Sequence, residues 1–470
     1  MELQHRAGLI LVATLITACT VGPDYVRPSV EVPDTFKEAA GWKLAEPRDE
    51  APRGPWWQVY GDPALNALEE QIANANQDVQ AAAARLRQAR ALLQGARANE
   101  FPTVTANTSI NRAEGIIGSG TNRNTTATTY NLALDVSWEV DLWGRVARTV
   151  EANQATLVAN TADFAAVRLS AQAALAQTYF QLRIADTQQR LLEDTVVAYQ
   201  TSLRLTQNQY SFGVIPRANV LQAQTQLQTT RALAVDVGIQ RATLEHAIAI
   251  LIGRPPANFS LAVKIQPAAL PPLPVIIPAT LLERRPDIAA AERRVAAANA
   301  EIGVAQAAFF PSLTLSSGSG FRGTDISNWL TSPNRFWSVG PALASTLFDA
   351  GSRRAQTEQV IAAYDITVAS YRQAVLNAFQ EVEDNLSTLT LLGREASIQE
   401  QAVQAARESV RLTMNQYQAG LVNYLNVVTV QAALLSAERT SNDLLGRRLA
   451  ASVTLLKALG GDWEISSTRI

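Results

Sequence analysis

The chain has 470 residues, and its 40 lysine and arginine residues nearly balance 42 aspartate and glutamate residues, which gives a formal net charge of −2. This balance argues against a nucleic-acid partner, because nucleic-acid-binding proteins carry a strongly basic surface. Hydrophobic residues make up 47% and charged residues 17%, a composition that fits long helices or a folded membrane protein. One cysteine and two histidines are too few for a disulfide framework, a metal site or a catalytic triad, so we expect neither an enzyme nor a cofactor.

Residues 1–18 are predicted to be a lipoprotein signal peptide. The apolar run from Ala7 to Ile16 is too short to span a bilayer, and small residues precede Cys19. This order resembles a bacterial lipobox, in which the cysteine becomes the new N-terminus and carries covalent lipid on its thiol and amine. Thr20 stands where an aspartate commonly retains such lipoproteins in the inner membrane, so the resemblance implies outer-membrane sorting. An ordinary signal peptide with an incidental cysteine is the alternative.

Three segments are expected to lie outside the regular elements. The stretch 19–61 is rich in proline and tryptophan, and we expect it to be ordered because Trp42, Trp56 and Trp57 should pack against other residues. Residues 254–278 form a proline-rich connector, since proline interrupts a continuous helix. Residues 462–470 form a C-terminal tail.

The two halves of the chain repeat each other. Residues 208–227 align without a gap with residues 415–434, and the offset of 207 pairs Tyr210 with Tyr417 and Gly213 with Gly420. Upstream, "FPTVT" from Phe101 matches "FPSLT" from Phe310 at an offset of 209. We therefore predict a first structural repeat over 62–253 and a second over 279–461.

Each repeat is predicted to contain a helix, two strands, a long helix and a returning helix. The first helix runs from about 63 to 99, with its counterpart at 279–309. The runs 145–209 and 352–416 contain no proline and would each span about 100 Å as helices. Turns around Gly213 and Gly420 then lead into returning helices of about 35 residues. Both turns could be simple helical hairpins.

The predicted strands carry a membrane-type pattern. Apolar and polar residues alternate without a fault from Tyr130 to Val140, as a transmembrane barrel strand requires. The pattern predicts strands at about 103–113, 128–140, 312–322 and 336–348. Four strands cannot close a barrel, so several chains would have to share one. A soluble, half-buried sheet is the alternative.

The chain resembles the bacterial outer-membrane efflux channel family of the TolC/OprM type, and more closely its lipoprotein (NodT-like) branch. The resemblance rests on "CTVGPDYVRP" after the lipobox, "LLERRPDI" at 281–288, "FFPSL" and the paired Tyr-x-x-Gly turns. It implies an α+β membrane protein that forms a homotrimer. Each chain would give four strands to a twelve-stranded transmembrane β-barrel, which continues into a long periplasmic α-helical coiled-coil barrel.

This resemblance also implies a function and partners. Such proteins sit in the outer membrane of Gram-negative bacteria, anchored to its lipid, and extend into the periplasm. They dock on a periplasmic adaptor (membrane fusion) protein and an inner-membrane efflux pump. They passively conduct drugs or other small molecules outward. Type I protein secretion and metal or siderophore export are alternatives, and a structural coiled-coil envelope lipoprotein is a weaker one.

The resemblance places a periplasmic aperture just after the second Tyr-x-x-Gly turn. Leu425 matches a constricting leucine of the lipoprotein branch. Asn426 and Thr429 match positions that are often acidic in the family, so the ring in this chain would be polar and neutral. The alternative is that both residues merely satisfy hydrogen bonds at the helix tip.

Two further roles follow from the same resemblance. A tyrosine-to-acid link that holds some members closed becomes Tyr417 to Asn219 here, without a charge, and Val422 stands at the partner arginine position. The turns at Gly213 and Gly420 are expected to contact the adaptor.

We predict that Cys19→Ser, exported with an ordinary cleavable signal, still gives outer-membrane trimers, because a barrel would hold each trimer in the bilayer and the lipid would be a second anchor. Membrane fractionation with native electrophoresis checks this outcome. Recovery of the variant as a soluble periplasmic protein would contradict the barrel assignment.

Overall fold

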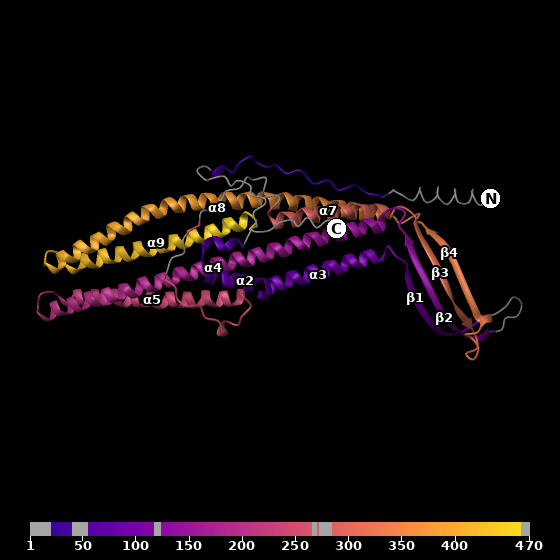
Figure 1. Ribbon diagram of the computed structural model, residues 1–470, viewed down its shortest axis with the longest axis horizontal. Helices are drawn as coiled ribbons and strands as arrows, with labels where there is room; N and C mark the ends of the chain where they lie inside the picture. Colours follow the sequence, from indigo (N-terminus) through magenta and orange to yellow (C-terminus); the bar gives the residue numbers. More distant parts are fainter. Residues whose placement is uncertain (1–19, 40–54, 117–123, 266–269, 272–283, 462–470) are drawn as a thin grey trace. The chain divides into compact units, whose positions relative to one another are not determined.

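The computed structural model describes residues 20–39, 55–116, 124–265, 270–271 and 284–461. The predicted signal peptide, Cys19, Trp42 and the predicted tail lie outside these residues. The elements are η1 (Lys37–Ala39), η2 (Trp56–Tyr60), α2 (Pro63–Ala75), α3 (Gln77–Ala98), β1 (Thr103–Ile116), β2 (Asn124–Val140), α4 (Arg145–Ser211), α5 (Arg217–Leu251), η3 (Pro256–Asn258), α7 (Pro286–Ala307), β3 (Ser312–Gly323), η4 (Ser332–Asn334), β4 (Arg335–Ala344), α8 (Ser352–Gln418) and α9 (Tyr424–Ala458) (Figure 1).

The described chain forms two compact units, and each draws on both predicted repeats. The first unit takes its described residues from 1–29, 85–161 and 290–372, and the second from 30–84, 162–289 and 373–470. The sheet therefore belongs to the first unit. The ends of the helical hairpins belong to the second unit.

The long helices confirm the predicted helical runs. Helices α4 and α8 have 67 residues each, which corresponds to about 100 Å. Helices α5 and α9 return with 35 residues each. None of the described helices combines the length and the hydropathy needed to cross a membrane.

The first helix of the first repeat is interrupted, whereas the sequence predicted one helix over 63–99. Helix α2 ends at Ala75 and α3 begins at Gln77, because Asn76 adopts an extended conformation between them. The Asn76 side chain accepts hydrogen bonds from the backbone N–H groups of Asp78 (3.0 Å) and Val79 (3.1 Å), which caps α3. Its amide also donates to the Leu251 carbonyl at 2.8 Å, which ties the break to the end of α5.

The strands form one four-stranded antiparallel sheet in the order β1-β2-β3-β4. Leu134 on β2 lies opposite Ala106 on β1 and Ser319 on β3. Strands β1 and β2 extend beyond their predicted ends near 113 and 128. Strand β4 instead ends at Ala344, short of the predicted 348, because its last partner is Ser312 and the preceding Pro311 has no N–H to continue the ladder.

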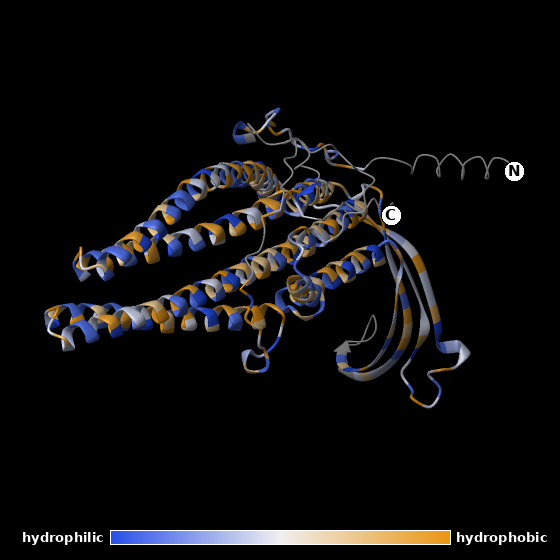
Figure 2. Cartoon of the chain, turned by 60° about the vertical axis from the view of Figure 1, so that its left-hand side comes forward, coloured by the Kyte–Doolittle hydropathy of each residue, from blue (hydrophilic) through white to orange (hydrophobic). Residues whose placement is uncertain are grey.

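The sheet has one apolar and one polar face, as the alternation predicted. The apolar face exposes Val104, Ile110, Leu132, Leu134, Leu315, Trp337, Val339 and Leu343. On the opposite face the Asn107 amide donates to the Asp135 carboxylate at 2.8 Å. Figure 2 shows the orange hydrophobic bands along the strands. A continuous face of large exposed apolar side chains is unfavourable in water, so this face is expected to contact lipid or another protein.

The main core of the second unit joins η2, α2, α4, α5 and α9. Trp56 and Trp57, which the sequence expected to be packed, are both buried and make an edge-to-face contact. The core contains Trp56, Trp57, Tyr60, Leu65, Leu68, Ile72, Leu175, Tyr179, Phe180, Ile248, Ile252, Leu449 and Val453. Segments that are far apart in sequence thus share one hydrophobic cluster.

The "RRPDI" motif fixes the start of α7 within the second unit. The buried Arg285 guanidinium binds the Asp287 carboxylate (2.6 Å), the Glu381 carboxylate (2.7 Å) and the Ala458 carbonyl (3.2 Å). The Arg285 side chain therefore connects the start of α7, the middle of α8 and the end of α9. A planar guanidinium with five N–H donors suits this role.

The "VGPDY" segment is clamped within the first unit. The Val21 N–H donates to the Trp143 carbonyl at 3.0 Å, and Arg148 binds the Val21 carbonyl (3.3 Å) and Asp24 (3.1 Å). Gly22 has a φ of 108°, and a Cβ added to it would lie 2.4 Å from the Gly303 Cα atom. The segment therefore lies in direct backbone contact with α7.

Glu69 is a buried carboxyl group without a hydrogen bond among the described residues. It is 1% exposed and lies on the same face of α2 as Leu65 and Ile72. Burial without a partner disfavours the charged form and raises the pKa of Glu69 to about 9.

We predict that Glu69→Gln stabilises the protein near neutral pH. The unfolded chain ionises Glu69 near its ordinary pKa of 4.5, whereas the folded chain keeps it protonated up to about pH 9. Ionisation therefore favours the unfolded state in this window, and the variant should gain about 2–3 kcal/mol at pH 7. Melting temperatures at pH 7 and pH 4.5 check this: the gain should vanish at the lower pH. The exposed neighbour Glu70→Gln is the control, and a gain that is equal at both pH values would contradict the explanation.

Candidate functional site: the hairpin ends and the adjoining cleft

Both hairpin turns use the same backbone structure. The Gly213 N–H donates to the Tyr210 carbonyl and the Val214 N–H to the Gln209 carbonyl, both at 2.9 Å. The turn at Gly420 repeats these bonds. This is the Schellman arrangement, which needs a left-handed residue, and Gly213 and Gly420 have φ values of 71° and 75°. The sequence repeat thus encodes two equivalent helix ends.

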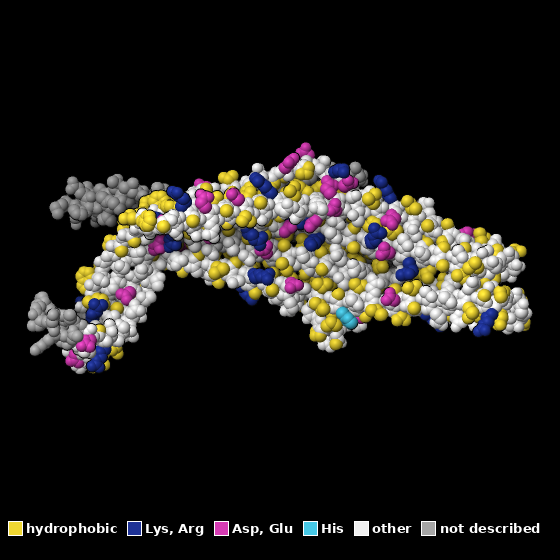
Figure 3. All heavy atoms as spheres, turned by 180° about the vertical axis from the view of Figure 1, so that it is seen from behind, with side chains coloured by type: hydrophobic (Ala, Val, Ile, Leu, Met, Phe, Trp, Pro, Cys, Tyr) yellow, Lys and Arg dark blue, Asp and Glu magenta, His cyan; other side chains and the backbone are white. Residues whose placement is uncertain are grey.

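Exposed apolar side chains gather at these two turns. Phe212, Val214 and Leu421 are all largely exposed, and Phe212 reaches 83%. On the face that Figure 3 shows, the hairpin ends carry many hydrophobic and few charged side chains. Such an apolar surface suits contact with another protein.

The three predicted aperture residues lie together on one exposed face of the first turns of α9. Leu425 is 54% exposed, and Asn426 and Thr429 are exposed beside it. The Asn423 side chain caps the helix by accepting from the Asn426 N–H at 3.2 Å. The Thr429 hydroxyl donates to the Leu425 carbonyl at 2.9 Å, so part of its polarity is used within the helix.

Tyr417 makes a different contact from the one that the sequence predicted. Its hydroxyl donates to the Gln209 side chain at the end of α4, and no hydrogen bond among the described residues joins it to Asn219. The ring packs against Tyr424, with 5.5 Å between the centroids. Within one chain, therefore, the tyrosine links α8 to α4; a link to Asn219 stays a prediction.

The two repeats differ at this tyrosine. Tyr417 is 4% exposed, whereas its counterpart Tyr210 is 45% exposed. Burial raises the pKa of Tyr417. The hydroxyl-bearing Ser202 and Thr206 of α4 are also buried beside this cluster, and Ser202 meets the Gln431 amide at 3.4 Å. The ends of the two hairpins thus share a partly polar core.

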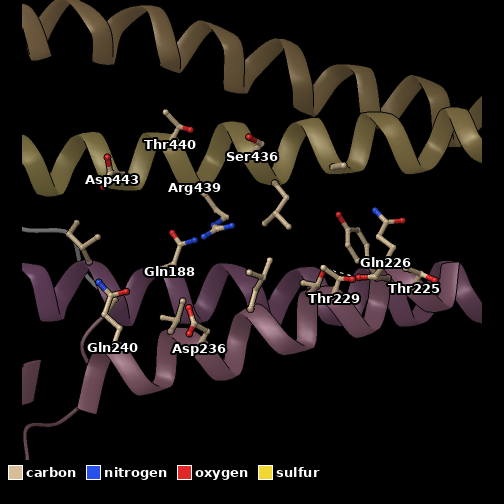
Figure 4. A pocket seen from close by; sticks show the side chains of 18 of the residues that line it. Gln188, Thr225, Gln226, Thr229, Asp236, Gln240, Ser436, Arg439, Thr440 and Asp443 are labelled. Atoms are coloured by element: carbon tan, nitrogen blue, oxygen red, sulfur yellow. Dashed lines mark hydrogen bonds between the residues drawn. The ribbon is translucent and has the colours of Figure 1, made fainter. Parts of the chain in front are cut away.

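A cleft that sequence reasoning missed lies between α9 and the α4/α5 pair, with a volume of about 1410 Å³. Figure 4 shows Arg439 extending from α9 toward Gln188 of α4, with Gln226 in the space between the ribbons. Asp236 and Asp443 also line it, and they occupy equivalent positions in the two repeats. The equivalence of these two aspartates was the only feature of the sequence that could have pointed to the cleft. The sequence alone does not show that α5 and α9 face one another.

Comparisons with known proteins agree with this architecture. The model of the outer membrane efflux protein family matches residues 68–254 and 277–461. The chain belongs to this family. The toluene efflux pump outer membrane protein TtgC of Pseudomonas putida is 30% identical over 97% of this chain and 95% of its own length. The pyoverdine export outer membrane protein OpmQ of Pseudomonas aeruginosa is 30% identical over 98% of both chains.

A solved structure supports the same conclusion. The outer-membrane channel OprN superposes with a TM-score of 0.87 at 33% identity, over 94% of this chain and 99% of that chain. The predicted fold class, outer-membrane location and efflux function are confirmed. The protein is an outer-membrane channel component of an efflux system, and the relatives named here are channel and efflux proteins rather than enzymes.

We predict that Tyr417→Phe loosens the junction of α8 with α4. A hydrogen bond of this kind contributes about 1 kcal/mol, so opening of the hairpin ends should become about fivefold more frequent. Hydrogen exchange of the amides in 414–427, measured by mass spectrometry, checks this. Tyr210→Phe, at the exposed equivalent position, should leave exchange at its own turn unchanged. Equal effects of the two variants would contradict a special role for Tyr417.

Proposed function

We propose that three copies of this chain share one twelve-stranded barrel in the outer membrane. The observation that carries the proposal is the two-faced sheet, in which β1 and β4 each pair on one side only within the described chain. An unpaired strand edge in hydrocarbon is very costly, and pairing β1 of one copy with β4 of the next removes every edge. The exposed apolar face then meets lipid, and the polar face lines the pore.

We further propose that Cys19 carries covalent lipid as a second anchor. The lipobox-like sequence supports this, and so does the clamping of the next residues: the Val21 N–H binds the Trp143 carbonyl at 3.0 Å, next to the first turn of α4. No other cofactor enters the proposal.

The hairpin ends are proposed to dock on a periplasmic adaptor, which connects the channel to an inner-membrane pump. The exposed Phe212, Val214 and Leu421 beside Gly213 and Gly420 support an apolar protein contact. Leu425, Asn426 and Thr429 are proposed to line the periplasmic aperture, and their shared exposure on α9 supports this. Tyr417, through Gln209 in its own chain or Asn219 in a neighbour, is proposed to hold the aperture closed.

The cargo is proposed to be small molecules, including drugs. Relatives of equal similarity are named for toluene and for pyoverdine, which differ greatly in size and polarity. We therefore assign the main choice of cargo to the pump. Crosslinking in cells at positions 212 and 421 would identify the adaptor and, through it, the pump.

We predict a conducting trimer with weak cation preference and little pH dependence, because the aperture ring carries no charge. Reversal potentials in planar bilayers under a salt gradient check this. Asn426→Asp should raise the cation preference severalfold, since three carboxylates would then face the aperture. Gln228→Glu, an exposed change farther along α5, is the matched control.

Two outcomes would contradict parts of this proposal. Absence of conductance both from native trimers and from trimers of Tyr417→Phe, whose aperture should open more often, would reject the channel. Strong cation preference that survives Asn426→Ala and Thr429→Ala would reject the neutral aperture.

A further inference from the structure

The cleft beside α9 continues the line of the predicted aperture. Counting along α9, Leu425 and Thr429 are followed by the cleft-lining residues Ala432, Ser436 and Asp443 at steps of three, four and seven. This spacing keeps all five positions on one face of the helix. If the aperture lies where the proposed function puts it, on which this inference rests, the cleft opens into the conduit.

The lining of the cleft is divided into a neutral and a charged part. The part nearer the hairpin ends, between positions 218 and 233 of α5 and between 428 and 436 of α9, contains no charged lining residue. The charged lining residues Asp236, Arg439, Asp443 and Arg447 all follow these positions. Both parts lie along the same helices, and of the charged residues only Asp236 and Asp443 are equivalent in the two repeats.

The neutral part also contains buried polar atoms without hydrogen bonds. The Gln226 amide lies close enough to the Tyr199 hydroxyl for the two groups to interact, but the contact lacks the geometry of a full hydrogen bond, and neither group bonds to any other described residue. Tyr199 is only 4% exposed. Both residues line the cleft, and Figure 4 shows Gln226 between α9 and the α4/α5 pair. Buried polar groups of this kind are costly unless a partner reaches them.

Apolar side chains surround these polar groups. Leu221, Leu233 and Leu435 line the same part of the cleft. A bound charge would lose its hydration here without a compensating countercharge, whereas a neutral group could exchange hydrogen bonds with an amide and a phenol. The lining therefore favours one chemical class of solute.

We propose that the neutral part of the cleft is a transit site for uncharged amphiphilic molecules. Their aromatic or aliphatic body packs on Leu221, Leu233 and Leu435. Their amide or hydroxyl groups hydrogen-bond to Gln226 and Tyr199. Solutes that leave the aperture would meet this site before the charged part of the cleft.

Equilibrium dialysis of chloramphenicol against the purified full-length trimer in amphipol tests the proposal. Chloramphenicol is neutral, aromatic and carries an amide and hydroxyl groups. Gln226→Leu should weaken its binding about tenfold, the usual effect of losing one or two hydrogen bonds to a solute. Gln228→Leu, an exposed change on the same helix outside the cleft, should leave binding unchanged.

Stability separates this role from a structural one. Replacing an unsatisfied buried amide by leucine should leave the melting temperature unchanged or raise it, while binding falls. Thr225→Trp, which fills the neutral part of the cleft, should abolish saturable binding in a second variant. Chloramphenicol succinate, the charged ester of the same molecule, should bind the native trimer at least tenfold more weakly.

Equal binding by Gln226→Leu and the native trimer, equal binding of the succinate, or absence of saturable binding would overturn the proposal. Bilayer conductance separates failure of the transit site from failure of the proposed function. A conducting trimer that does not bind chloramphenicol rejects the transit site alone. Absence of conductance from both the native and the Tyr417→Phe trimers rejects the channel.

Discussion

The backbone hydrogen bonds of the sheet impose the constraint on which the rest of the structure depends. Within the described chain, β1 and β4 each leave one side without a partner strand. A membrane-facing sheet cannot keep such edges, so the chain is complete only as part of an assembly. Both strand pairs lead directly into the longest helices, because α4 begins five residues after β2 and α8 begins eight residues after β4. Closure of the barrel would thus also bring the helices of the copies together.

The two repeats have the same helices and turns, but they differ in burial and charge at equivalent positions. The turns at Gly213 and Gly420 share every backbone bond, yet Tyr417 is buried where Tyr210 is exposed. The two repeats also differ in their buried charges. The buried Asp186 of the first repeat binds Arg183 and Arg241 at 2.9 and 2.7 Å, whereas glycine stands at its equivalent position in the second repeat. A buried ion-pair cluster therefore joins α4 to α5 in the first hairpin, whereas the more exposed pair of Arg407 and Glu438 (2.7 Å) joins α8 to α9 in the second.

Much of the fold could be predicted from the sequence, because long helices and alternating strands carry strong periodic signals. The break at Asn76 was missed although the repeat contained a signal for it: Pro286, a residue favoured at the first position of a helix, begins α7 and aligns with Gln77, where α3 begins. The aperture residues remain a prediction from resemblance; the structure shows only that Leu425, Asn426 and Thr429 lie together on an exposed face of α9. The Gln209 partner of Tyr417 and the cleft could not be predicted, since both depend on which faces of four helices meet. The spacing of apolar residues along a helix does not determine which helix faces which.

The clamped segment after Cys19 has a consequence for the membrane itself. Thr20 lies so close to Gly144 that a Cβ added there would come within 2.3 Å of its Cγ2 atom. Lipid on Cys19 would begin one residue away, about 3.8 Å of chain, beside the first turn of α4. Lipid attached there would enter the bilayer near the level where β2 ends, so a bilayer whose hydrocarbon thickness differs from the height of the sheet would have to deform locally around the anchor.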